Sequence, residues 1–103
     1  MNKLDILKFL LEDDKGQVES FLQVGKVYAF RSVTMIYTGR ILKINSQEIL
    51  IEEAAWIPET ERWADFVANG SHKEAEPYTN SVILNRGALL DVTEIPSVIR
   101  KQK

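Results

Sequence analysis

Most of the sequence after residue 23 consists of short segments rich in β-branched and aromatic residues, separated by short polar turns. Segments of this kind are typical of β-strands. We expect five strands, which cover residues 26–33, 37–44, 48–54, 82–85 and 88–92. Because only Asn45, Ser46 and Gln47 separate the second strand from the third, these two strands are expected to form a hairpin. The chain is therefore predicted to be mainly β.

Three further segments complete the expected organisation. Residues 1–15 are interpreted as an N-terminal helical segment, because leucines recur at helical spacing within residues 2–13. The insert at residues 55–80 is rich in aromatic residues and is expected to form an ordered lid, with a short helix over residues 59–68. Residues 96–103 are interpreted as a tail that frays.

The composition is that of a single globular domain. The chain has 103 residues, no cysteine and a net charge of −2. A chain of this length fits one domain, and the lack of cysteine excludes disulfides and thiolate metal sites. No apolar run is long enough to span a membrane. The first residues do not follow the arrangement of a signal peptide, because Asp5 and Lys8 interrupt their apolar stretch. We therefore expect a cytoplasmic protein with no membrane partner.

The small net charge conceals an uneven distribution. Residues 46–76 carry eight acidic and two basic residues, a charge of −6, while the segments on either side carry +2 each. This balance argues against a nucleic-acid-binding protein that depends on a strongly basic surface. The same charge balance does not exclude a small local basic site.

Two motifs in the predicted strands resemble those of Sm-like proteins. In the first, Gly39 begins a run of alternating apolar residues, which is followed by the polar turn at residues 45–47 and an apolar third strand with an acidic end. In the second, an apolar strand is followed by Arg86 and Gly87 and then by another short apolar strand. A glycine within a strand, such as Gly39, also permits the strong bend that a small barrel needs.

The resemblance implies the fold and the assembly of this family. The fold would be an N-terminal α-helix followed by a five-stranded, strongly bent, SH3-like barrel with a helical insert between strands three and four. Residues 1–103 would form one Sm-like domain, with strands one to three in residues 24–54 and strands four and five in residues 81–95. Sm-like proteins join strand edges between subunits, which implies a homo-oligomeric ring of about five to seven copies. The insert is similar to those of small Sm-like proteins carried by phages and prophages.

The resemblance also implies that single-stranded RNA or a small nucleotide binds at the turns that contain Asn45, Gln47, Arg86 and Gly87. Asn45 and Gln47 could read a base edge, and Arg86 could clamp a phosphate. The sequence departs from the family pattern, however, because no aromatic residue is present for base stacking and Glu48 falls where an asparagine is usual. Ring formation therefore fits the sequence better than the usual uridine pocket does.

Other interpretations of the basic and aromatic residues stay open at this stage. Arg86 could instead pair with Glu48 or Asp91 and serve only to fix its turn. A second basic patch could form from Arg31, Arg40 and Lys43, although strict alternation along a strand sends Arg40 and Lys43 to opposite faces. The strand aromatics, which could stack on bases but more often belong to a core or an interface, are Tyr28, Phe30 and Tyr37.

No residue pattern indicates catalysis, a cofactor or a metal site. His72 is the single histidine, and it lies in a polar stretch with Glu74 and Glu76. Glu52 and Glu53 are adjacent, so on a strand they face opposite sides and cannot act as an acid–base pair. We therefore expect a binding protein and not an enzyme. The alternatives to RNA binding are a ring that holds a small nucleotide-like ligand and a structural or adaptor protein without nucleic-acid binding.

Overall fold

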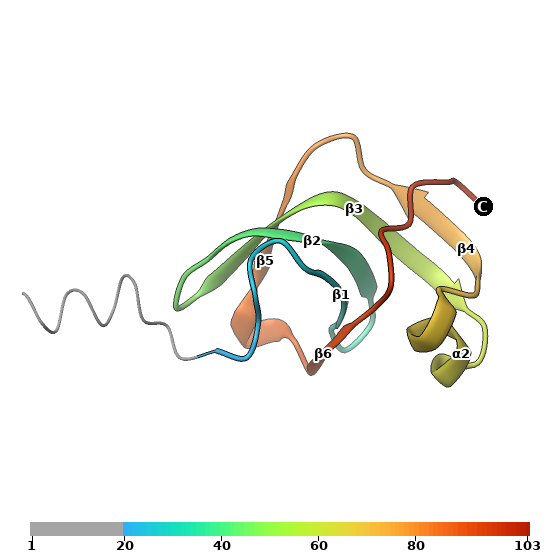
Figure 1. Cartoon of the computed structure of the whole chain (residues 1–103), viewed down its shortest axis with the longest axis horizontal. Helices are drawn as coiled ribbons and strands as arrows, with labels where there is room; N and C mark the ends of the chain where they lie inside the picture. Colours follow the sequence, from blue (N-terminus) through green and yellow to red (C-terminus); the bar gives the residue numbers. More distant parts are fainter. Residues whose placement is uncertain (1–19) are drawn as a thin grey trace, which may run out of the picture.

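The computed structural model describes residues 20–103, which form a small, mainly β domain with one α-helix (Figure 1). The prediction of a mainly β chain is confirmed, whereas the predicted helix over residues 2–13 lies outside the described residues. The elements in chain order are β1 (Val27–Arg31), β2 (Ile36–Ile44), β3 (Glu48–Thr60), α2 (Trp63–Asn69), β4 (His72–Pro77), β5 (Val82–Asn85), the 3-10 helix η1 (Arg86–Ala88) and β6 (Asp91–Glu94).

The strands pair in one antiparallel sheet with the order β4-β3-β2-β1-β6, and β5 pairs with β3 beside this path. The first part of β3 pairs with β5 and its second part pairs with β4. The sheet therefore has six strands, one more than predicted, because the insert contributes β4. Within residues 20–103, β4, β5 and β6 each have a single partner strand, and the other edge of β4 bonds to the backbone of Lys103 through Ala75. The edges of β5 and β6 are therefore the ones left open in the described sheet.

The sheet bends at a bulge where Gly39 faces β3. The register of β2 and β3 shifts between Thr38 and Arg40, and Glu53 has a positive φ of 50°. A Cβ on Gly39 would lie 2.8 Å from Ile51 Cδ1 and 3.1 Å from the Glu52 carbonyl oxygen. Since only glycine leaves room for this close approach, Gly39 has the bending role that the sequence indicated.

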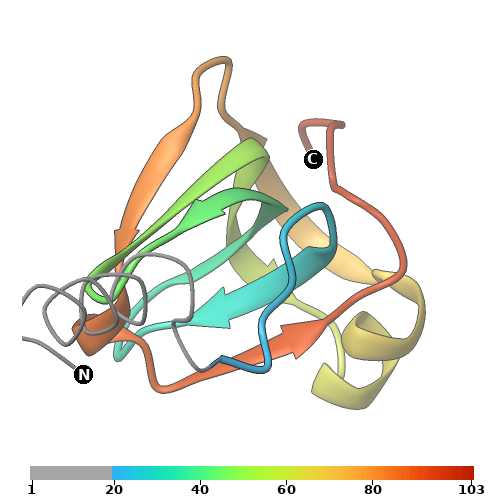
Figure 2. The same ribbon diagram turned by 60° about the vertical axis from the view of Figure 1, so that its left-hand side comes forward.

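Two hydrophobic cores lie on opposite faces of the curved sheet. The inner core includes Phe30, Ile41 and Ile51, all at most 1% exposed. The outer core is formed where α2 and the C-terminal residues cover the other face, and it includes Phe66 and Ile99. Figures 1 and 2 both place α2 and β4 at the end of the sheet opposite the β2–β3 turn. The outer face is therefore covered at one end of the sheet only.

The insert at residues 55–80 was expected to form an ordered lid with a short helix, and most of it instead extends the sheet. β3 continues through Trp56 to Thr60 and pairs with β4. The predicted helix is present as α2, although it begins at Trp63, four residues later than predicted over residues 59–68. The sequence signal for β3 was cut short at Ala54 because the bulge interrupts the alternation there.

The C-terminal residues are packed, which corrects the prediction of a frayed tail. Ile99 is 7% exposed in the outer core. The backbone groups of Lys103 and Ala75 exchange two hydrogen bonds of 3.0 and 3.1 Å. The Arg100 guanidinium donates to the carbonyl oxygens of Ala54 (2.7 Å) and Tyr78 (2.8 Å). These contacts hold the C-terminal residues against β4 and the bend of β3.

No helix in residues 20–103 is long and apolar enough to cross a membrane.

Candidate functional site

The β2–β3 turn is built around the Asn45 side chain. Its Oδ1 atom accepts hydrogen bonds from the backbone N–H groups of Gln47 (2.8 Å) and Glu48 (2.7 Å). The backbone N–H of Asn45 donates to the Glu48 carbonyl oxygen at 3.0 Å and closes the turn. Asparagine suits this position because its side chain satisfies backbone donors that a short turn leaves unpaired.

The turn that contains Arg86 and Gly87 packs directly against the β2–β3 turn. The backbone N–H of Arg86 donates to the Gln47 carbonyl oxygen (2.9 Å), and Arg86 Nη1 donates to the Asn45 carbonyl oxygen (2.6 Å). The Gly87 N–H donates to Asn85 Oδ1 at 3.0 Å, which caps η1. The structure thus brings together all four residues that the sequence singled out, namely Asn45, Gln47, Arg86 and Gly87.

The alternative pairing of Arg86 with a carboxylate is not what the structure shows. Arg86 contacts the Asn45 backbone carbonyl, and Asp91 is held by Arg31 instead. Gly87 lies in η1 and does not have a positive φ, so its backbone angle does not require glycine. A Cβ there would meet Asn85 Oδ1 at 3.4 Å, an ordinary contact.

A groove that the sequence interpretation missed adjoins these turns on the outer face of the sheet. It consists of two adjoining hollows of about 270 and 300 Å³, and its lining residues are Lys43, Ile44, Asn45, Gln47, Glu48, Leu50, Ile83 and Asn85. Leu50 lies directly opposite Ile83, and Glu48 lies directly opposite Asn85. Alternation in residues 82–85 could have indicated it, since Leu84 is buried while Ile83 and Asn85 are exposed.

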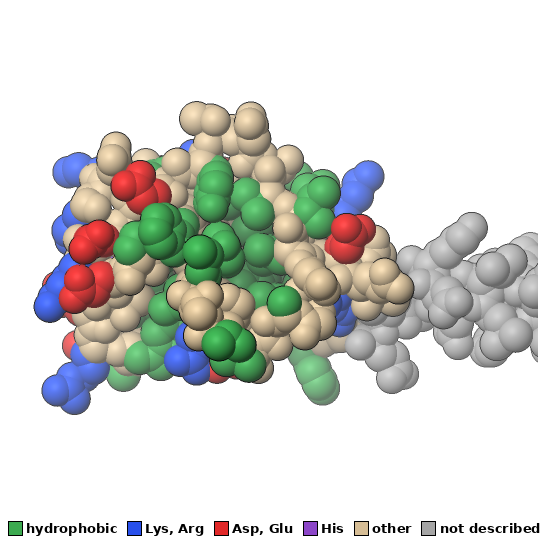
Figure 3. All heavy atoms as spheres, turned by 180° about the vertical axis from the view of Figure 1, so that it is seen from behind, with side chains coloured by type: hydrophobic (Ala, Val, Ile, Leu, Met, Phe, Trp, Pro, Cys, Tyr) green, Lys and Arg blue, Asp and Glu red, His purple; other side chains and the backbone are tan. Residues whose placement is uncertain are grey.

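Figure 3 shows the molecule from behind, with hydrophobic side chains gathered over a hollowed centre and charged side chains toward the two ends. Ile83 and Leu90 are among the exposed apolar residues of the described chain, at 64% and 69% exposure. A small domain that presents such residues beside open strand edges has apolar surface available for a partner.

The basic residues Arg31, Arg40 and Lys43 project from the same face of the sheet. Arg40 lies opposite Glu52 and Lys43 lies opposite Leu50, and these β3 residues share a face. A second register shift, between Ile41 and Lys43, adds a residue to β2, which is why strict alternation gave the wrong answer.

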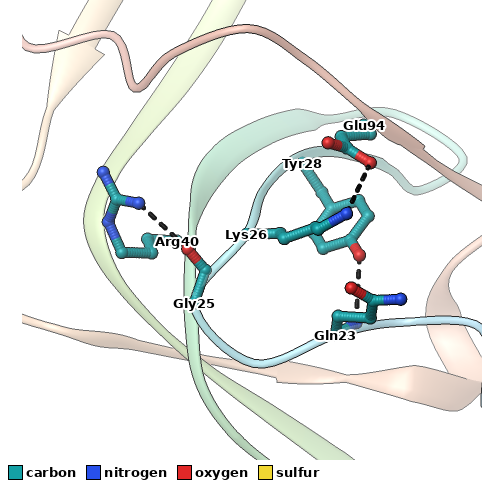
Figure 4. Close-up of polar contacts among 6 residues, drawn as sticks. All are labelled: Gln23, Gly25, Lys26, Tyr28, Arg40 and Glu94. Carbon is teal, nitrogen blue, oxygen red and sulfur yellow. Dashed lines mark hydrogen bonds and ion pairs between the residues drawn. The ribbon is translucent and has the colours of Figure 1, made fainter.

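Both arginines of this set make contacts within the domain. Arg40 donates to the Gly25 carbonyl oxygen at 3.0 Å and to Glu53 Oε1 at 3.2 Å (Figure 4). Gly25 has a φ of 91°, so the loop before β1 requires glycine there. Figure 4 also shows Lys26 near Glu94 across the start of β1. Arg40 is therefore an anchor for this loop.

Arg31 joins β1 to β6 and to α2. Its guanidinium donates through Nε to Asp91 Oδ1 (2.8 Å) and through Nη2 to Asp91 Oδ2, and it lies 4.2 Å from the centre of the Trp63 ring. The hydrogen bond from Arg31 lowers the pKa of the Asp91 carboxyl, and the same bond raises the pKa of Arg31. Of the three basic residues, Lys43 is the one that lines the groove.

The strand aromatics divide between the core and the surface. Tyr28 and Phe30 are buried in the inner core, so neither is available to stack on a base. Tyr37 is half-buried, and burial, followed by its proximity to Tyr78, raises the pKa of its hydroxyl. Its hydroxyl contacts Met35 Sδ at 2.9 Å.

Residues 20–103 contain no group of three or more histidine, cysteine, aspartate or glutamate side chains placed to hold a metal ion. His72 Nδ1 lies 2.6 Å from the Gly70 carbonyl oxygen, and its ring packs edge-on against Phe66. His72 thus takes part in packing near α2.

Comparison with known proteins returned no matching family model, no matching curated protein and no matching solved structure.

Proposed function

We propose that the protein is a non-catalytic, Sm-like, cytoplasmic binding protein that assembles into a homo-oligomeric ring. In this proposal the domain is an SH3-like barrel extended by β4 and α2. Its copies join β5 of one subunit to β6 of the next, and single-stranded RNA or nucleotides bind at the repeated turns of Asn45, Gln47 and Arg86.

The two open strand edges support the ring. Each of β5 and β6 pairs with a single strand within residues 20–103, and Leu90, which is 69% exposed, lies directly before β6. Unpaired edges expose backbone donors and acceptors, and pairing between copies satisfies both edges at once. Such a contact joins two different surfaces, so it closes into a ring when the rotation between copies permits.

The contact between the β2–β3 turn and the turn of Arg86 and Gly87 supports the proposal of RNA binding. Arg86 is fixed by its Nη1 contact with Asn45, which leaves other guanidinium N–H groups for a phosphate. Asn45 and Gln47 belong to the turn that Arg86 contacts, and the lining of the groove includes both residues. One weak contact per copy becomes effective when a ring repeats it along one strand.

Fluorescence anisotropy with short A-rich and U-rich RNAs tests this function. Arg86→Ala is expected to weaken binding to every sequence and to reduce the slope of log affinity against log salt by about 1. Arg62→Ala is the matched control, since Arg62 is exposed and precedes α2 at the other end of the sheet. Equal affinity and equal salt dependence for wild type and Arg86→Ala would show that the site is wrong.

The volume of the groove favours a second candidate, a ring that holds one small nucleotide per subunit. Hollows of about 270 and 300 Å³ have the size of single-ligand sites and not of a long channel. A small mass retained on protein purified from cells, detected by native mass spectrometry, would favour this candidate over RNA binding.

A further inference from the structure

The groove on the outer face of β3 and β5 has an apolar floor beside a polar edge. Leu50 and Ile83 are cross-strand partners, and Ile83 is 64% exposed. The next cross-strand pair on the same face is Glu48 and Asn85. Side chains of directly opposed residues are close neighbours. A flat ligand lying on Leu50 and Ile83 would therefore meet Glu48 and Asn85 at its edge.

Hydrogen bonds to the backbone orient the two asparagine side chains near the groove. Asn85 Oδ1 accepts from the Gly87 N–H, and Asn45 Oδ1 accepts from the N–H groups of Gln47 and Glu48. Backbone N–H groups can only donate, so the oxygen of each amide must face them. The Nδ2 group of each amide is then left as a donor for a ligand.

The groove therefore presents donors beside a carboxylate that can only accept. Asn85 and Asn45 offer amide N–H groups, while Glu48 offers two acceptor oxygens. Lys43 borders the same groove and places a positive charge near its edge. This arrangement matches a planar ligand that carries one acceptor followed by two donors along one edge, with an anionic group attached.

We propose that this groove binds the base of a guanine nucleotide within single-stranded RNA. The Watson–Crick edge of guanine has the acceptor O6 followed by the donors N1–H and N2–H. The carboxylate of Glu48 accepts from N1–H and N2–H, and an asparagine Nδ2 donates to O6. The base face covers Leu50 and Ile83, and Lys43 attracts a neighbouring phosphate. This inference rests on the proposed RNA-binding function and assigns the base preference of that site.

The other bases match the groove less well. Uracil has two acceptors around its single donor, so one of its carbonyl oxygens would face the carboxylate. Cytosine and adenine offer one amino group beside a ring acceptor, which would face the second carboxylate oxygen. A site built for hydrogen bonding rejects ligands that leave its polar groups unpaired.

Binding of pentameric RNAs that differ at one central base tests the proposal. UUGUU, UUAUU, UUCUU and UUUUU are compared at one salt concentration, and the single guanine avoids stacked guanine assemblies. We expect UUGUU to bind at least about tenfold more tightly than UUUUU, as a matched hydrogen-bonding pair provides. Replacing the guanine by hypoxanthine, which lacks the N2 amino group, is expected to give intermediate affinity.

Glu48→Gln is expected to remove the preference for guanine, because an amide cannot offer two acceptors. Glu52→Gln is the matched control, since Glu52 lies on the same strand and face and the charge change is identical. Equal binding of all four pentamers would overturn the guanine assignment while leaving RNA binding intact. A preference that persists in Glu48→Gln would overturn the role of Glu48. If none of the four pentamers binds, the proposed RNA-binding function itself is wrong.

Discussion

Replacing Phe66 by alanine tests whether α2 is an integral part of the domain or a separable lid. Phe66 is fully buried in the outer core, and its ring stacks on Trp63 with 5.4 Å between ring centroids. Removing a buried phenylalanine side chain costs about 3–5 kcal/mol. A domain of this size is stable by about 5–15 kcal/mol. The substitution should therefore remove a large share of the free energy of unfolding.

Urea denaturation followed by two probes measures this effect. Trp63 fluorescence, in a Trp56→Phe background, reports on α2, and far-UV circular dichroism reports on the whole sheet. If the outer core unfolds together with the inner core, the two transitions coincide, and both shift to lower urea in Phe66→Ala. Phe66→Leu provides a milder change in the same direction if the alanine variant does not fold.

Val33→Ala is the control, because Val33 is 81% exposed and its truncation should change stability by less than about 0.5 kcal/mol. A loss below about 1 kcal/mol in Phe66→Ala would contradict the assignment of α2 to a core, given the 3–5 kcal/mol expected for a buried ring. A fluorescence transition that precedes the circular dichroism transition would also do so, since α2 would then unfold alone.

Two further predictions concern the frame of the sheet. Gly39→Ala should destabilise the domain by about 1–3 kcal/mol in the same assay, because the added Cβ meets Ile51 and the Glu52 carbonyl at the bulge, whereas Gly87→Ala should have a much smaller effect. Asp91→Asn should destabilise the protein at neutral pH but not at strongly acidic pH. The pKa of Asp91 is lowered in the folded state, so its contribution is present above the unfolded pKa and is lost as the pH falls through the folded pKa. Urea midpoints that differ equally at both pH values would contradict the second prediction.

The sequence predicted the parts of the fold that regular alternation encodes. The sequence predicted the positions of three strands and one turn to within a few residues, namely β1, β2, β5 and the β2–β3 turn. Their apolar residues alternate or cluster between clear turns. The full length of β3 was missed because the bulge at Glu53 breaks the alternation. Ile99 is buried because it joins the core that α2 and the sheet form together, and no local pattern encodes such tertiary contacts.

The candidate site, like the fold, could be predicted from sequence only where local patterns determine it. Asn45 and Arg86 could be selected from sequence because each lies in a short turn with a recognisable polar pattern. Their direct contact depends on β5 pairing with β3, which is a long-range feature. The pairing of Glu48 with Asn85 and of Leu50 with Ile83 depends on the same register, so the groove becomes visible only in the folded chain.

We propose that copies of this chain assemble through the open edges of β5 and β6, and the mass of the native assembly tests this most directly. Native mass spectrometry of the full chain should give one species of about five to seven copies, as expected for a closed ring built from one heterologous contact. Glu94→Pro in β6 should reduce that mass, because the Ile95 N–H donates to Val27 of β1 and the N–H of Glu94 therefore points away from β1, toward the open edge. Glu94→Ala is the matched control, since it loses the same ion pair with Lys26 but keeps the backbone N–H. A monomer of 11.8 kDa over the micromolar concentration range would contradict the account.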